Sequence, residues 1–160
     1  MTHSDSAERG AHVRFPPPLV FLGGILLGLA CEYLVAPAPV PVGRVISAGG
    51  GLVILIVGLS LVASARVLFS RTGQSPLPWM PSPSLIWKGP YRHTRNPMYV
   101  GVTLVELGLG VAVNNLWIAL FAIPALAIVH VIAVLPEERY LSEKFGESYT
   151  LYLGQVRRYL

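Results

Sequence analysis

Two polar clusters interrupt an otherwise apolar sequence, and both contain residue types that bind charged ligands. The first is the stretch GPYRHTRNPMYVG, from Gly89 to Gly101, which places Arg92, His93 and Arg95 just before an apolar run. Arginine side chains and the free backbone N–H groups at a helix start both bind anionic groups such as carboxylates. This cluster is therefore a candidate for one wall of a binding site.

The second cluster runs from His130 to Arg158 and contains the adjacent carboxylates Glu137 and Glu138. If Pro136 begins a new helix, the helix dipole favours carboxylates in its first turn, so a purely structural explanation is available. Carboxylates and aromatic faces also bind cations. A pocket built from both clusters would suit a ligand that carries a positive and a negative charge.

Glu106 and His130 are ionisable residues inside apolar runs, where a charge costs several kcal/mol and by default indicates a function. Tyr99, Thr103 and Glu106 share one helical face, and His130 shares a face with Glu137. Counted from the polar ends of their runs, Glu106 and His130 reach a similar depth. Two interpretations are open: a hydrogen bond between them that joins two helices, or a binding role.

The composition indicates that these residues are set in a membrane protein. Of 160 residues, 53% are apolar and 12% are charged, whereas soluble domains have about 25% charged residues. The net charge of +4 forms no basic stripe on a soluble module, so no nucleic-acid partner is expected. The single cysteine, Cys31, excludes a disulfide within the chain.

Four apolar runs approach the length of about 20 residues that a membrane-spanning helix needs. They are Leu19 to Val35, Val45 to Leu68, Met98 to Val113, and Leu116 to Leu135. Because only Asn114-Asn115 separates the last two, these must form a tight antiparallel hairpin. The predicted fold is all-α, with about four transmembrane helices and a C-terminal amphipathic helical segment in the membrane interface, broken at Gly146. We expect a disordered tail over residues 1–18 and a single membrane domain over 19–160.

Lysine and arginine residues predict the orientation of this domain. Of the twelve basic residues, only Arg44 falls between the first and second runs, which leaves eleven on the opposite side. Basic residues collect on the cytoplasmic side of membrane proteins. The pattern therefore places both termini and both polar clusters on the cytoplasmic face of a plasma or inner membrane.

Three segments, in order, resemble the integral-membrane methyltransferase family that includes isoprenylcysteine carboxyl methyltransferases and phospholipid methyltransferases. The first is G-P-Y-R-x-x-R-N-P-M-Y-x-G at 89–101, and the second is His130 followed after six residues by Glu137-Glu138. The third is F-G-x-x-Y-x-x-Y at 145–152. Each segment is a weak signal, but the ordered set is specific and covers about residues 60–158.

The resemblance implies S-adenosylmethionine as the methyl donor, no metal, and a donor site within about residues 85–158. It implies donor contacts for Tyr91, Asn96, Pro97, Tyr99, His130, Glu137 and Glu138. Arg95 and Glu138 are the expected catalytic residues, which position acceptor and donor. Glu106 is a candidate acceptor contact, whereas His93 falls at a variable motif position and is expected to be a bystander. Asn96 replaces the histidine of many relatives and so removes a titratable group.

The resemblance also implies a lipidic or hydrophobic acceptor that enters from the membrane, similar to an isoprenylcysteine carboxylate or a phospholipid. Most acceptor contacts should come from the first two runs and the connection from Phe69 to Lys88. The acceptor atom, O, N or S, and the oligomeric state are open. One alternative is a non-catalytic four-helix protein whose basic loop binds anionic lipid head groups. A lipid phosphotransferase is disfavoured, because the sequence lacks clustered aspartates that would hold Mg²⁺.

Overall fold

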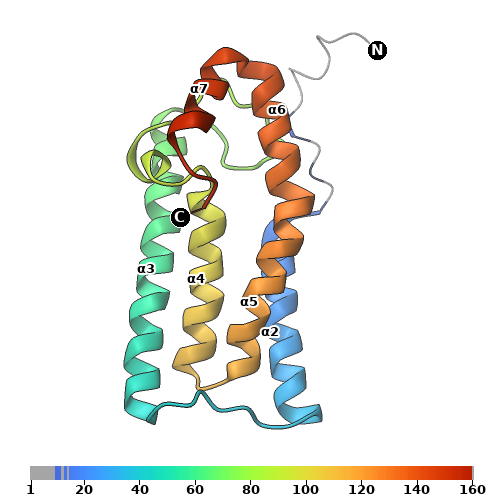
Figure 1. The fold of residues 1–160 in the computed structure, drawn as a ribbon, viewed down its shortest axis with the longest axis vertical. Coiled ribbons are helices and arrows are strands. Elements are labelled where there is room, and N and C mark those ends of the chain that lie inside the picture. The colour runs from blue at the N-terminus through green and yellow to red at the C-terminus, as the bar shows by residue number, and fades with distance from the viewer. Residues whose placement is uncertain (1–9, 12, 14, 160) are drawn as a thin grey trace.

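The computed structural model describes residues 10, 11, 13 and 15–159, and these form helices and connections without a β-strand (Figure 1). The elements are α2 (Pro17–Leu34), α3 (Arg44–Arg71), the 3₁₀ helix η1 (Gly89–Arg92), α4 (Pro97–Ala112), α5 (Leu116–Val129), the π-helix η2 (His130–Val134), α6 (Leu135–Phe145) and α7 (Glu147–Gln155). The all-α prediction is confirmed. Of the tail predicted to be disordered, residues 1–9, 12 and 14 lie outside the described residues.

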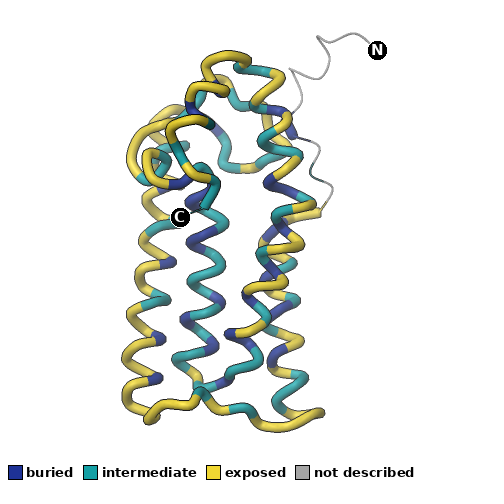
Figure 2. Tube along the Cα trace, viewed as in Figure 1, coloured by how far each residue is buried: buried dark blue, intermediate teal, exposed yellow. Residues whose placement is uncertain are grey.

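The long helices run side by side, with α3 packed on α4, α4 on α5, and α5 on α2 (Figure 1). Within the described chain, three helical segments are long and apolar enough to cross a membrane: α2, α3 and the continuous segment Leu116–Phe145. The fourth, α4, is apolar but has only 16 residues, or about 24 Å of helix. Much of the outer surface of α3 is exposed (Figure 2), and its exposed side chains are mainly apolar, as lipid contact requires.

Glycines allow α3 and α4 to approach closely. A Cβ atom added to Gly58 of α3 would lie 2.7 Å from the Gly101 carbonyl oxygen of α4. A Cβ atom added to Gly108 of α4 would lie 2.4 Å from the Leu55 nitrogen of α3. Small residues permit such backbone contacts between membrane helices. This interface fixes α4, which carries Pro97 and Tyr99 of the first polar cluster and Glu106.

The hairpin between α4 and α5 is as tight as the sequence predicts. Asn114 adopts a left-handed conformation with φ 60°, which asparagine tolerates better than most residues. Its Oδ1 atom accepts a hydrogen bond from the Val40 N–H at 3.1 Å. Asn115 caps α5 by accepting from the Ile118 N–H at 3.0 Å. These bonds close the end of the bundle that lies far from the polar clusters.

The helix of the last apolar run does not end at Leu135, where the sequence predicted either a new helix or a kink at Pro136. The chain stays helical from Leu116 to Phe145, because α5 passes through the π-helix η2 directly into α6. Pro136 has no N–H group to donate to the preceding turn, and the wide π turn accommodates it without a break. Glu137 and Glu138 therefore do not begin a separate helix with a free end, and the helix dipole does not account for them.

The C-terminal segment folds back over the polar end of the bundle (Figure 1). Gly146, with φ 51°, separates α6 from α7, which confirms the predicted break. After α7, residues Val156–Tyr159 form a short extended strap that runs beside the start of α4. The Arg95 N–H donates to the Arg157 carbonyl at 2.9 Å, and Thr94 forms a parallel bridge with Arg157. The strap thus joins the two polar clusters of the sequence.

Candidate active site

A cavity of about 240 Å³ lies at the polar end of the bundle. Its walls come from the start of α2, the end of α3, the connection after α3, η1, the start of α4, and α6. Most of its lining side chains are apolar, including Phe21, Phe69, Leu77, Leu85, Ile86, Val102 and Leu141. This volume is smaller than the about 300–1,000 Å³ of typical small-molecule sites, so the cavity would hold only part of a larger ligand.

One wall of the cavity is polar and contains five of the predicted site residues: Tyr91, Arg95, Asn96, Tyr99 and Glu137. The Tyr99 hydroxyl donates to Glu137 Oε2 at 3.2 Å, which joins α4 to α6. Tyr91 comes from η1, Arg95 and Asn96 from the connection that leads into α4, Tyr99 from α4 and Glu137 from α6, and the fold brings them together. Both polar clusters thus contribute to one cavity wall, although His130 and Glu138 of the predicted pocket are not part of its lining.

Glu138 lies behind this wall and connects two arginines. Arg158 binds it in a bidentate manner, with Nη2 2.8 Å from Oε2 and Nε 3.1 Å from Oε1. Arg95 Nη2 lies 3.5 Å from Glu138 Oε1. The hydrogen bonds to Glu138 raise the pKa of Arg158 above its ordinary value, so the Arg158 guanidinium stays charged. Bidentate arginine–carboxylate pairs fix both partners in geometry.

Two buried polar atoms of the cavity-lining residues have no hydrogen-bond partner among the described residues. One is Arg95 Nε, a donor, and the other is Gln74 Oε1, an acceptor. Gln74 uses its Nε2 atom to donate to Ser84 Oγ at 2.7 Å. Buried polar atoms usually have partners, so these two indicate groups that a ligand would supply. A ligand with both an anionic or acceptor group and a donor group would satisfy them.

The strap is held by contacts that the sequence did not predict. The Arg158 carbonyl accepts from Asn96 Nδ2 and from Thr94 Oγ1, each at 3.1 Å. The Asn96 N–H in turn donates to Thr94 Oγ1 at 3.2 Å. Asn96 therefore lines the cavity and anchors the strap. The partners in these two bonds are 62 and 64 positions apart in the sequence, so no local motif predicts the contacts. Only Arg158, at the end of the second polar cluster, gave a sequence signal for the strap.

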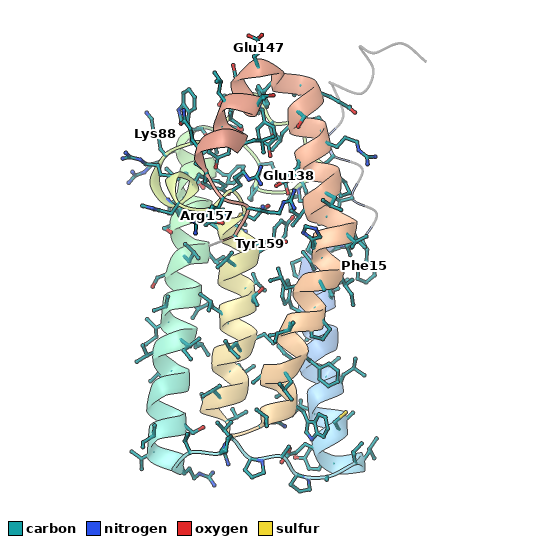
Figure 3. The ribbon with its side chains drawn as sticks, in the orientation of Figure 1. Phe15, Lys88, Glu138, Glu147, Arg157 and Tyr159 are labelled. Atoms are coloured by element: carbon teal, nitrogen blue, oxygen red, sulfur yellow. The ribbon has the colours of Figure 1, made fainter. Side chains whose placement is uncertain are left out.

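Four of the predicted site residues do not line the cavity: Glu106, Pro97, His130 and Glu138. Pro97 is the buried first residue of α4, where proline suits a helix start. His130 Nδ1 lies 2.7 Å from the Tyr159 hydroxyl, so it contacts the strap (Figure 3 labels Tyr159). His93, the expected bystander, is exposed and also absent from the cavity wall.

The interpretation of Glu106 and His130 as a hydrogen-bonded pair is wrong. Neither carboxylate oxygen of Glu106 has a partner in the described part of the chain. Glu106 is eight residues from Asn114, whereas His130 is fifteen residues from Asn115. The seven-residue difference corresponds to about 10 Å along a helix. The similar depth was counted from Leu135, which is not the end of the last helix.

The connection of residues 72–88 forms the wall opposite α4. Its prolines leave it without regular structure, but the Ser82 N–H donates to the Tyr140 hydroxyl of α6 at 3.1 Å. The Ala11 N–H donates to the Pro78 carbonyl at 2.7 Å, so the segment before α2 also holds this wall. The sequence predicted acceptor contacts from this connection but not how it is fixed.

Tyr152 holds α7 against η1 through a hydrogen bond from its hydroxyl to the Tyr91 carbonyl at 2.7 Å. Burial raises the pKa of Tyr152 to about 12, although Arg95 opposes this change. The hydroxyl therefore remains protonated and keeps donating at neutral pH. Through this contact, α7 holds the backbone of Tyr91, which lines the cavity.

The comparison with protein families follows the same elements. The sequence matches the family model described as phospholipid methyltransferase over residues 46–148. This is 103 of 160 residues, from 148 − 46 + 1, and it includes α3, α4, α5, α6 and the cavity walls that they form. No curated protein matches the sequence. The chain belongs to the phospholipid methyltransferase family.

Proposed function

We propose that this protein is an S-adenosylmethionine-dependent methyltransferase that modifies a lipidic acceptor at the cytoplasmic face of a membrane. Family membership supports methyl transfer, and the apolar helices support a membrane setting. One observation carries the proposal. A single cavity joins the Arg95 guanidinium and the Glu137 carboxylate to a wall of apolar side chains, so charged and lipidic groups meet there.

The residues of the cavity fit the methyl donor. S-adenosylmethionine carries a carboxylate, an ammonium and a sulfonium. The unpartnered Arg95 Nε atom is a donor for a carboxylate. Glu137 and the Tyr91 ring lie in the same lining and suit positive charge. When bound, the donor would supply a methyl group whose carbon the acceptor's nucleophilic atom attacks in line, while the C–S bond breaks and S-adenosylhomocysteine leaves.

The chain's own contribution is positioning and charge. Glu138 orients Arg95, and Tyr99 orients Glu137 through their mutual hydrogen bond. Fixed charges in a site that excludes water stabilise a developing charge without reorganisation. Holding two reactants in line also lowers the entropic cost of their reaction. Pro97 and His130 contribute indirectly, by setting the start of α4 and by holding the strap.

Basic residues support a cytoplasmic location for the cavity end. Arg44 begins α3 at the far end of the bundle, whereas the other described basic residues follow at the cavity end, where Figure 3 labels Lys88 and Arg157. The positive-inside rule then places the cavity, α7 and the strap in the cytoplasm. We also propose one membrane domain with the donor site within about 85–158. The expected boundary between residues 18 and 19 falls inside α2, which begins at Pro17, and the Ala11 N–H binds the Pro78 carbonyl, so the described part of residues 1–18 belongs to this domain.

Donor binding tests this function. Purified protein in lipid nanodiscs is titrated with S-adenosylmethionine in a calorimeter, together with Arg95→Ala and the nearby, exposed Arg92→Ala. We expect saturable binding to wild type and to Arg92→Ala, and at least about tenfold weaker binding to Arg95→Ala, since one charge-assisted bond contributes about 1.5–3 kcal/mol. Absence of saturable binding to wild type would favour the alternative, a protein that binds anionic head groups.

A further inference from the structure

Glu106 lies in the middle of α4 with only 1% of its surface exposed, and both of its carboxylate oxygens lack a partner among the described residues. Its side chain points at Gly24 of α2. A Cβ atom added to Gly24 would lie 2.3 Å from Glu106 Oε1. Glycine at this position therefore leaves the room that the carboxyl group occupies.

Other polar side chains of the bundle have local partners. Thr103, on the same helix, donates to the Tyr99 carbonyl at 2.8 Å. Glu32, at the far end of α2, accepts from the Ala38 N–H at 3.1 Å. A buried carboxyl group without a partner is costly in apolar surroundings, and groups of this kind inside membrane helices are retained for function. Glu106 is thus the exception that needs a ligand to explain it.

Glu106 is also close to the cavity. Val102, one turn before it on α4, lines the cavity, and so does Phe21, which precedes Gly24 on α2. Glu106 therefore lies beneath the cavity floor, about 6 Å deeper than Val102 and about 10 Å deeper than Tyr99 along the helix. The polar wall near Tyr99 and the Glu106 carboxyl lie on one line from the head of the cavity into the membrane.

We propose that Glu106 binds the methyl acceptor through an O–H or N–H group that the acceptor carries on the membrane side of its methylated atom. The proposal rests on the proposed function, which places the methylated atom near Tyr99 and Glu137. The proposal requires the Glu106 side chain, which has three rotatable bonds, to turn from Gly24 towards the cavity floor when the acceptor binds. The acceptor class is then a lipid with a hydroxyl, amide or second amine between its head and its hydrocarbon tail.

The stability of variants separates this role from a structural one. A glutamate that only joins helices would stabilise the bundle, so its removal would lower the melting temperature. Because Glu106 is unpartnered, we expect Glu106→Leu to raise the melting temperature by about 3 °C. The matched change Glu32→Leu removes a satisfied carboxylate and should lower it. A lower melting temperature for Glu106→Leu overturns the proposal, whether or not methyl transfer is detected.

A pair of lipids tests the ligand class directly. Phosphatidylethanolamine and ceramide phosphoethanolamine share a head group, but only the second carries O–H and N–H groups just below it. Thermal unfolding of wild type, Glu106→Gln, Glu106→Leu and Glu32→Leu is measured with each lipid. We expect ceramide phosphoethanolamine to stabilise wild type and Glu32→Leu more than phosphatidylethanolamine does. This difference should shrink in Glu106→Gln, whose amide oxygen still accepts a hydrogen bond, and vanish in Glu106→Leu. Equal effects of the two lipids on wild type overturn the proposal.

Kinetics complete the test. Membranes are incubated with labelled S-adenosylmethionine, and the labelled lipid is identified by mass spectrometry. We expect an O–H or N–H group on the membrane side of the methylated atom, and a KM for that lipid at least about tenfold higher in Glu106→Leu with unchanged donor affinity. A product with only ester linkages there contradicts the proposal but leaves the proposed function intact. Failure of the wild-type protein to bind S-adenosylmethionine contradicts the proposed function instead.

Discussion

Glu138 and Glu106 are two carboxylates of the same bundle with opposite surroundings. Glu138 lies beside the cavity and is held by Arg95 and Arg158, whereas Glu106 lies between α2 and α4 without a hydrogen-bond partner among the described residues. The paired carboxylate builds a fixed geometry from distant parts of the chain. The Glu106 carboxylate has no hydrogen-bond donor among the described residues. We therefore assign the paired carboxylate a role in positioning other residues, and the unpaired carboxylate a role in binding a ligand.

Breaking the paired carboxylate should have the largest effect. Glu138→Ala leaves Arg95 and Arg158 without their shared partner, so we expect methyl transfer to fall at least about 100-fold through lost positioning. Since Glu138 is largely buried and Arg158 is 39% exposed, the loss of stability should be about 2 kcal/mol. Initial rates and urea unfolding measure these effects. Glu143→Ala, an exposed change on the same helix, is the control and should behave as wild type.

Asn96 and Asn114 allow the cavity end and the far end of the bundle to be compared by matched substitutions. Each side chain forms a long-range hydrogen bond to a backbone group. Asn96→Ala and Asn114→Gly, which keeps the positive φ, should each cost about 1 kcal/mol of stability. Only Asn96→Ala should weaken donor binding, by about tenfold, because it releases the strap beside the cavity. Equal donor affinity in the two variants would separate the strap from the donor site.

Gly24 tests whether the unpaired carboxylate sits where the structure places it. Gly24→Ala brings a methyl group against Glu106 Oε1, and we expect a cost of about 1–2 kcal/mol from this overpacking. In the Glu106→Ala background the same change should cost less than about 0.5 kcal/mol. A double-mutant cycle of thermal unfolding measures the coupling. Additive effects would show that the two residues are not in contact.

Tyr152 gives the smallest and most specific prediction. Tyr152→Phe removes the hydrogen bond to the Tyr91 carbonyl and should cost about 1 kcal/mol near pH 7. Because burial raises the pKa of Tyr152 from 10.0 to about 12, its protonated form is favoured in the folded state. The stability from this group is complete below pH 10 and declines as pH rises towards 12. The difference between wild type and Tyr152→Phe should therefore be constant from neutral pH to about 9 and then shrink.

The sequence predicted the helices because apolar length is a strong signal, and it predicted the hairpin because Asn114-Asn115 leaves no room for a longer connection. It did not predict the end of the last helix, since Pro136 normally interrupts a helix and the compensating π turn has no sequence signature. That error also moved His130 to the wrong depth. The lengths of the apolar runs thus predicted the helix bundle, but they did not predict where its last helix ends or how deep His130 lies along it.

The candidate site was predictable where local motifs carry it. Arg95, Asn96 and Tyr99 stand within one motif, and Glu137 follows at a fixed distance from His130, so these positions were found from the resemblance. The strap contacts were not, because Thr94 and Arg158 are distant in the sequence and meet only in the folded chain. The opposite wall was missed in detail because a proline-rich connection has no periodicity that fixes its path.

A measurement of methyl transfer tests the proposed function most directly. Nanodiscs that contain wild type or Arg95→Ala are incubated with S-adenosylmethionine labelled in its methyl group, and the label in the extracted lipids is counted with and without EDTA. We expect label in a lipid with wild type, the same amount in EDTA, and at least about tenfold less with Arg95→Ala. Wild type that binds the donor but leaves the lipids unlabelled, or equal labelling by Arg95→Ala, would contradict the proposed function.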